Sequence, residues 1–580
     1  MKTSTVEYLE KRIAPATIFV THLLDDGSAG SLRKAIADAN LTPAPDTIVF
    51  KPTAFGTITL GGTDLDITTP LTIKGPGAGK VIINGNNVSG IFNIDDGNGA
   101  KDTPVTISGL ALVNGNDSDG GAIKSLESLT LVNSIISGNT ASSDGGGIYV
   151  KTDGKFIMTG TTVTGNTAKD GGGLYLEVAG GISITNSTIS GNTATSGKGG
   201  GAYISTLVST NLTAKFLIKD TTIVGNRATG NGGGLYLAPD GRDISVINST
   251  ITGNTAGING GGISMGYGGL LLKGGILSGN TAESGGGIFV QVRSGKTSTI
   301  TGTKILNNTA TVSNGGGIQF DGSGSATATF NVLKSTIAGN RAITDGGGIS
   351  ATNGGTLNLT GDTLFANEAH LFGGGVLTSG SAASTVILNV TASTFTENTA
   401  GGGGGIFAGG EGAVTIAKSK LIANHATNNF VGIAGGAYLR SASPITITST
   451  LFSKNSAVIR GGGLYVNTFN TTLTGCTFTD NVSEGGGGVG GEDGGEGGGA
   501  HIFSTNLAIT KTLIRGNYAG TNGGGISINA TTTTISKSII TGNIAKDSSG
   551  GVNSQAANTT LDAATKLFGN IAPVNPNKDF

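Results

Sequence analysis

The chain has 580 residues, of which 12% are charged, and it combines a formal net charge of −1 with 106 glycines, no tryptophan and one cysteine. Its lysines and arginines are scattered singly, so it lacks the clustered positive charge of phosphate-binding proteins, and nucleic acid is not an expected partner. A single cysteine, Cys476, excludes an internal disulfide or zinc framework and is expected to be a small buried residue. The sequence contains no run of about 18 apolar residues, so it predicts no transmembrane helix.

Residues 1–19 are predicted to be an export or N-terminal segment. The first twenty residues carry five charged side chains and no apolar stretch, so they are not an ordinary secretory signal peptide. The run Leu9-Glu10-Lys11-Arg12 resembles a short Leu-Glu-x-Arg motif on exported proteins of planctomycete and verrucomicrobial bacteria. That resemblance implies an envelope or export context.

Residues 20–105 are predicted to hold an N-terminal cap and the first turns of a repeating structure. Leu32, Ala35, Ile36 and Ala39 fall on one helical stripe, and Ser31 before them is a suitable N-cap. We therefore expect a short amphipathic helix that covers the open end of the first turn, as terminal repeats of solenoids require.

Residues 106–570 repeat one pattern about sixteen times. It consists of an apolar residue, two further residues, an asparagine, a few polar residues, and then a glycine run followed by apolar and aromatic residues. Successive anchor asparagines are 26 to 36 residues apart, a period that marks a solenoid. The anchors are Asn139, Asn166, Asn192, Asn226, Asn254, Asn280, Asn308, Asn340, Asn367, Asn398, Asn424, Asn455, Asn481, Asn517, Asn543 and Asn570.

Within each repeat the apolar residues alternate with a period of two, which indicates strands rather than helices. Ile184 and Ile189 are an odd number of residues apart, so the chain must bend near Asn186-Ser187 to bury both. These signals predict three short strands per repeat and an all-β fold, a parallel β-helix of about 17 rungs. Each anchor asparagine is expected to be structural, bonding to its equivalents in the turns before and after.

Two longer resemblances support this fold. Gly30-Ser31-Leu32-Arg33-Lys34-Ala35 resembles the core of the bacterial CSLREA module, with its cysteine and glutamate replaced, and implies an N-terminal cap on a surface β-helix. The repeats resemble the middle region of chlamydial polymorphic outer-membrane proteins, whose Phe-x-x-Asn motif is matched at Phe395–Asn398, Phe452–Asn455 and Phe478–Asn481. The second resemblance implies a right-handed parallel β-helix and an adhesin-like role at the cell surface.

An aromatic column is the sharpest candidate binding site. The second residue after the glycine run is a tyrosine in four successive repeats: Tyr149, Tyr175, Tyr203 and Tyr236. Alternation along the strand predicts that these side chains point outward. Such a stripe would stack on sugar rings, or it would be only a ladder that stabilises the coil. Later repeats place Phe289, Phe407, Tyr438 and Tyr465 there.

Carboxylates that follow the anchor asparagines form a second candidate site. Consecutive turns would bring Asp144 and Asp170 together, and paired carboxylates can hold calcium or act as acid and base. The alternative is a set of solvated turn residues. A polysaccharide lyase would need clustered carboxylates with a lysine or arginine on one strand face, and no repeat shows that combination, while the four histidines are dispersed. We therefore assign no catalytic residue, metal ligand or cofactor, and residues 571–580 are expected to be a tail.

Two classes of function stay open. The first is a secreted or cell-surface β-helix, adhesin-like or structural and associated with the outer membrane, that contacts polysaccharide or cell-surface glycans. The second is a carbohydrate-active β-helix enzyme, a polysaccharide lyase or glycosidase. The absence of a non-repeating polar cluster favours the first. Ice binding through flat threonine ladders is weakened by the variable spacing of the repeats.

Overall fold

A computed structural model describes residues 15–99, 101–207, 214–428, 432–485, 494–573 and 578–579. They belong to two compact units, unit 1 (Met1–Thr250) and unit 2 (Ile251–Phe580). Most of the predicted export segment, residues 1–14, lies outside the described residues, as does part of the predicted tail. No helix among the described residues has the length and apolarity to cross a bilayer.

The predicted helix is present in unit 1 as α1 (Leu32–Ala39). Its N-cap is Ser31, whose Oγ accepts a hydrogen bond from the Lys34 backbone N–H (3.1 Å). The four residues of the apolar stripe are buried, and the helix contacts β1 (Thr17–Val20) and β4 (Leu65–Ile67). It therefore covers the first turn, as the sequence predicts.

One turn of unit 1 shows the repeating plan. It consists of β15 (Ile148–Thr152), β16 (Phe156–Thr159), β17 (Thr162–Thr164) and β18 (Thr167–Ala168). The prediction of three strands per repeat is thus short by one. Two-residue strands like β18 are too short to produce an alternating pattern that could be recognised in the sequence.

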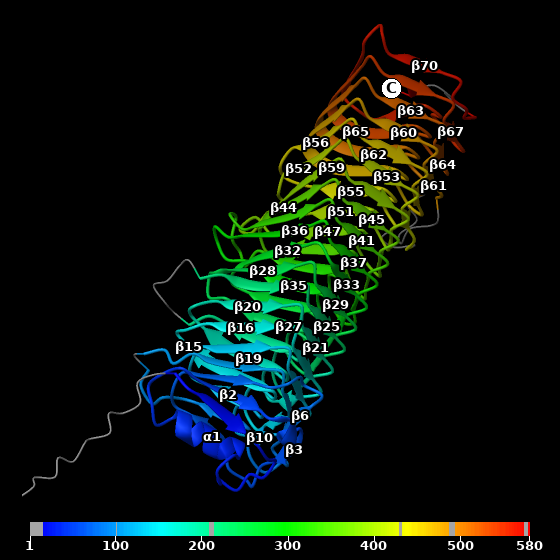
Figure 1. Ribbon diagram of the computed structural model, residues 1–580. Helices are drawn as coiled ribbons and strands as arrows, with labels where there is room; N and C mark the ends of the chain where they lie inside the picture. Colours follow the sequence, from blue (N-terminus) through cyan, green and yellow to red (C-terminus); the bar gives the residue numbers. More distant parts are fainter. Residues whose placement is uncertain are drawn as a thin grey trace, which may run out of the picture. The chain divides into compact units, whose positions relative to one another are not determined.

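Successive turns pair in parallel and in register, and Figure 1 shows their strands side by side within each unit. Ile148 of β15 pairs with Leu174 of β19 (Leu174–Val178), and Tyr149 pairs with Tyr175. The described residues contain 19 strands of the β17 kind, one per turn, against the predicted 17. The earliest of these strands, β3 (Gly56–Thr59), β6 (Val81–Asn84) and β9 (Ala111–Val113), precede the first anchor asparagine, so the motif does not reveal them.

The core lies inside the coil of each unit, built by alternate residues of every strand. In β15, Ile148 and Val150 are fully buried while Tyr149 between them is half-buried. Cys476 is buried as predicted, and its Sγ donates to the Ile447 carbonyl (3.4 Å). Burial raises the pKa of this thiol.

The anchor asparagines are buried and form one corner of the coil. The backbone N–H and the Nδ2 of Asn166 both donate to Oδ1 of Asn192, at 3.0 and 2.9 Å, and Nδ2 also donates to the Ile136 carbonyl (3.1 Å). Positive φ at this corner falls on the preceding residue, Gly165 (φ 63°), rather than on the asparagine. The predicted bend is a second corner, where Asn186 has φ 49°.

Candidate functional site

Four tyrosines occupy one outward position on adjacent strands of unit 1, and we call them the tyrosine surface. Tyr149 lies on β15, Tyr175 on β19, Tyr203 on β23 (Ala202–Ser205) and Tyr236 on β27 (Leu235–Ala238). The strands pair so that each tyrosine is opposite the next. All four side chains are half-buried.

The rings of the tyrosine surface stack on one another. Centroids of consecutive rings are 5.3, 4.6 and 5.1 Å apart, and the first two pairs are nearly parallel, with interplanar angles of 11° and 7°. Both faces of Tyr175 and Tyr203 are therefore covered by neighbouring rings. The predicted stacking of sugar rings has no free face at these two positions, and the surface presents ring edges and hydroxyl groups instead.

The phenol groups of Tyr149, Tyr175 and Tyr203 stay protonated at neutral pH. Burial, assisted by nearby carboxylates, raises the pKa of Tyr149 to about 12, and burial together with the neighbouring Tyr236 raises the pKa of Tyr203 to about 12. The pKa of Tyr175 is raised for the same reasons. Each hydroxyl can thus donate one hydrogen bond and accept another.

Carboxylates stand beside the tyrosines. Asp144 and Asp170 are paired by a parallel β-bridge, so consecutive turns do bring them together. Burial, with repulsion from Asp170 and then Asp119, raises the pKa of Asp144 to about 6. Asp144 and Glu177 are also among the charges that raise the tyrosine pKa values, so the acidic and phenolic groups share one electrostatic environment.

Lysines complete this surface. Lys124 Nζ lies 3.8 Å from Asp119 Oδ2, and Lys151 Nζ lies 3.0 Å from Glu177 Oε2. Lys198 Nζ donates to the Tyr236 hydroxyl (3.3 Å). Asp119 and Lys124 lie in the same turn, whereas the Lys151–Glu177 and Lys198–Tyr236 contacts join different turns. Register between turns thus adds contacts that a search of one repeat at a time does not reveal.

A second aromatic stack lies in unit 2. Centroid distances are 4.5 Å from Phe407 to Tyr438, 4.8 Å from Tyr438 to Tyr465 and 5.6 Å from Tyr465 to His501. Phe289 has the same strand position as these residues but does not join either stack. Its partners on the adjacent strands are Ser264 and Gln319, which are not aromatic.

The sequence did not identify His501, which is 3% exposed and extends the aromatic column. Neither of its ring nitrogens has a hydrogen-bond partner among the described residues, and Glu496 Oε2 lies 3.5 Å from Nδ1. Burial, then the charge of Arg460, lowers its pKa to about 3, so the ring is neutral. The one available signal was its place after the glycine run Gly497–Gly499.

A group of three carboxylates in unit 1 was also missed. Oxygens of Asp95, Asp96 and Glu127 lie within 4.8 Å of one another. The Thr103 backbone N–H donates to Glu127 Oε2 (2.8 Å), and Thr103 Oγ1 donates to Asp96 Oδ2 (2.6 Å). The chain itself thus supplies donors to this group.

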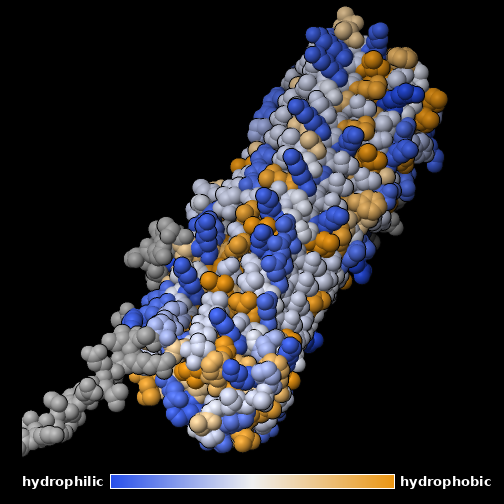
Figure 2. Space-filling model, in the orientation of Figure 1, coloured by the Kyte–Doolittle hydropathy of each residue, from blue (hydrophilic) through white to orange (hydrophobic). Residues whose placement is uncertain are grey.

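One face of the molecule can be followed in Figure 2, and it is mixed in polarity. On the face shown in Figure 2, apolar side chains are scattered among polar and small ones rather than gathered in one patch. Recognition on this face would therefore depend on local sets of polar groups and rings, not on a broad apolar area.

Comparison with known proteins identifies the fold family. A family model described as a right-handed β-helix region matches residues 75–251 and 209–391, which together exceed half of the chain. No curated protein matches the chain. A solved structure, the PL6 family alginate lyase AlyGC, is 10% identical over 96% of this chain and all of its own, with a TM-score of 0.22, too low to bear on function. The family match is sufficient by itself, and the chain belongs to the right-handed β-helix family.

Proposed function

We propose that this protein is a secreted or cell-surface β-helix that binds glycans without catalysis, in an adhesin-like or structural role, and that the tyrosine surface is its contact. The observation that carries the proposal is the register of Tyr149, Tyr175, Tyr203 and Tyr236 beside carboxylates and lysines. The resemblance of the repeats to chlamydial surface adhesins supports the proposed location.

The chemistry of this surface suits a polysaccharide. Its hydroxyl groups recur at the spacing of adjacent strands, about 4.8 Å. Phenol O–H groups and lysines donate, and Asp144, Asp170 and Glu177 accept, so the hydroxyl and carboxylate groups of a glycan would find partners of both kinds. Ring edges add apolar contact, while the stacked rings hold their positions before any ligand arrives.

Binding is tested by retention of the full chain on immobilised acidic and neutral polysaccharides, with and without calcium. Replacing Tyr175 and Tyr203 together by phenylalanine keeps both rings and removes two hydroxyls. We expect this variant to lose about tenfold or more in affinity for the retained glycan. Tyr267→Phe, at a tyrosine of unit 2 that is 41% exposed, is the matched control and should bind normally. Equal binding by all three proteins would exclude the tyrosine surface as the contact.

A carbohydrate-active enzyme is the second candidate, and Asp144 favours it. A carboxyl group with a pKa of about 6 beside a second aspartate is suited to general acid catalysis near neutral pH. Measuring new chain ends in the same incubations separates the two functions. Turnover that disappears in Asp144→Asn would overturn the non-catalytic proposal, whereas retention without turnover would support it.

A further inference from the structure

A trough crosses three turns of unit 2 where a loop is missing. In these turns the strand after the glycine run continues without interruption into the next strand, giving β59 (Leu464–Thr474), β62 (Ala500–Thr510) and β65 (Ile526–Ser536). The turn before them leaves the sheet at residues 441–444, and the turn after them at residues 555–557. The three loop-free strands thus form the floor of a trough of about 420 Å³ with a loop at each end.

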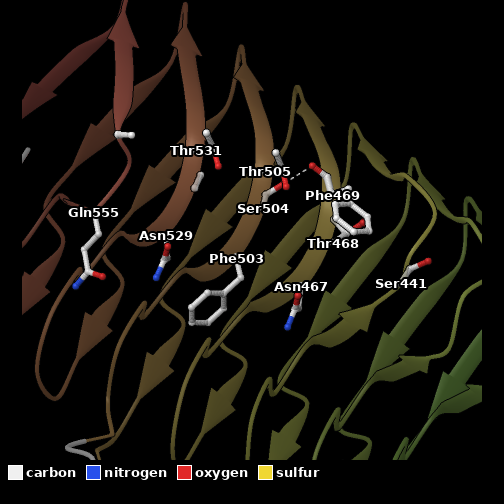
Figure 3. Close-up of a pocket in the computed structure, with 12 residues that line it drawn as sticks. Ser441, Asn467, Thr468, Phe469, Phe503, Ser504, Thr505, Asn529, Thr531 and Gln555 are labelled. Carbon is white, nitrogen blue, oxygen red and sulfur yellow. Dashed lines mark hydrogen bonds between the residues drawn. The ribbon is translucent and has the colours of Figure 1, made fainter.

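The floor presents a grid of outward side chains, shown in Figure 3. Asn467 pairs with Phe503 and Phe503 with Asn529, so these three form one row, which Gln555 extends. Two residues further along the strands a second row begins at Phe469. The second row consists of Phe469, Thr505 and Thr531.

Two phenylalanines give the trough its apolar contacts. Phe469 is 63% exposed, an unusual exposure for a ring of this size. Phe503 is half-buried, and its ring meets His501 edge-on with centroids 4.7 Å apart. Phe503 is thus fixed by the second aromatic stack, while Phe469 has a free surface.

The trough is held in shape by hydrogen bonds of the chain. Ser504 Oγ donates to the Asn506 carbonyl (2.9 Å), and Thr471 Oγ1 donates to Ser504 Oγ (3.1 Å). Thr468 Oγ1 donates to the Ser443 carbonyl (2.9 Å), which ties the floor to the loop at one end. A cavity set in this way requires little ordering when a ligand binds.

We propose that this trough binds a short segment of a neutral polysaccharide. None of its lining residues is charged, whereas an adjoining depression is lined by Glu411 and Arg440. Its volume lies in the range of small-ligand sites. The apolar face of a sugar ring would rest on Phe469, and the amides of Asn467, Asn529 and Gln555 and the hydroxyls of Thr505 and Thr531 would bond its hydroxyl groups.

This site is separate from the tyrosine surface and differs from it in chemistry. It shares with the proposed function only the class of ligand, because carboxylates and lysines surround the tyrosines and no charge lines the trough. An extended peptide is the competing occupant, but the floor strands are already paired on both sides and leave no free sheet edge for a peptide strand.

The test uses isothermal titration of the full chain with neutral fragments (β-glucan, mannan, xylan and galactan) and with polyuronate fragments of similar length. Phe469→Ala and Asn529→Ala change exposed residues and should leave the thermal midpoint unchanged. We expect each to weaken binding of one neutral fragment by about tenfold or more. Phe365→Ala, at a phenylalanine of unit 2 that is 41% exposed and lies on β45 (Thr363–Phe365), is the matched control and should bind like the unaltered chain.

The outcomes separate the two sites. Loss of neutral binding in Phe469→Ala, with neutral binding intact in the variant that replaces Tyr175 and Tyr203 by phenylalanine, supports the trough. No neutral fragment bound by the full chain, or neutral binding unaffected in both trough variants, would overturn it. Displacement of the neutral fragment by an unrelated extended peptide would overturn it in favour of the peptide. None of these outcomes depends on whether the tyrosine surface binds.

Discussion

The tyrosine surface of unit 1 and the trough of unit 2 use different positions of the same kind of strand. The tyrosines stand at the second residue of four successive strands, where each ring covers the next. The trough row begins two residues further along β59, at Asn467, whose partner Arg440 in the preceding turn ends β55 (Ala437–Arg440) just before the loop at residues 441–444. The second residue of these strands is therefore suited to stacking, whereas the sheet continues as far as the Phe469 row only where the loop is absent.

The largest expected effect is on the free energy of unfolding when an anchor asparagine is replaced. It tests whether the asparagine corner supports the tyrosine surface and the trough equally. Asn166 in unit 1 and Asn424 in unit 2 each donate two side-chain hydrogen bonds and accept two. We expect Asn166→Ala and Asn424→Ala each to lower the free energy of unfolding by about 5 kcal/mol, because they leave buried partners unsatisfied. Denaturant titration followed by circular dichroism measures this, with exposed Asn529→Ala as control. A change below about 1 kcal/mol in either unit would show that the scaffolds differ.

A titrating group in the scaffold of unit 2 gives the next effect. Asp362 is 1% exposed, accepts from the backbone N–H groups of Ser335 and Thr360, and has its pKa raised by burial to about 7. A raised pKa stabilises the fold fully below pH 4, and this contribution is lost as pH rises through about 7, at most about 4 kcal/mol. Neighbouring turns have serine here, Ser335 and Ser393. Asp362→Ser should flatten the pH dependence of the thermal midpoint, and an unchanged profile would contradict the assignment.

Tyr175 separates stacking from contact on the tyrosine surface. Tyr175→Ala removes two stacked pairs and should lower the free energy of unfolding by about 2 kcal/mol. Tyr175→Phe keeps both pairs and should change stability by less than about 0.5 kcal/mol while it weakens glycan retention. If the alanine variant were as stable as the phenylalanine variant, the rings would contribute nothing to the coil. Thermal unfolding of both variants decides this.

The smallest effect sharpens the contrast in charge. Asp144 becomes protonated as pH falls through about 6, which removes a negative charge from the tyrosine surface. Retention of an acidic polysaccharide should therefore strengthen by about twofold to fivefold between pH 7 and pH 5, and Asp144→Asn should abolish this change. Binding of a neutral fragment in the trough should stay constant over the same range. A pH-dependent trough would mean that a charged group reaches it.

The sequence predicted the features that recur in every turn. The anchor asparagines, the buried apolar positions and the bend at Asn186 follow from periodicity, and α1 follows from its N-cap and stripe. The number of turns was underestimated because the first three strands of the β17 kind, β3, β6 and β9, come before any anchor asparagine.

The candidate sites were only partly predictable. Alternation placed the tyrosines outward, but it could not show that their faces would cover one another, since that depends on ring rotamers. The cluster around Asp144 depends on register between turns. The trough arises because three turns have no loop between two of their strands. The length of a repeat does not tell which of its segments is short. His501 stacks on Tyr465, but it was missed because the column was recognised in the sequence by its tyrosines and phenylalanines.

The anchor corner also has a consequence for design. Asn166 and Asn192 are 26 residues apart and Asn192 and Asn226 are 34 apart, yet the side-chain bonds between them are 2.9 and 3.0 Å long. The corner thus keeps the turns aligned whatever the length of chain between two asparagines. Exposed segments can then be exchanged or lengthened independently, as modules on a frame of constant pitch, and a loop transplanted from one turn to another would move a binding surface without refolding its support.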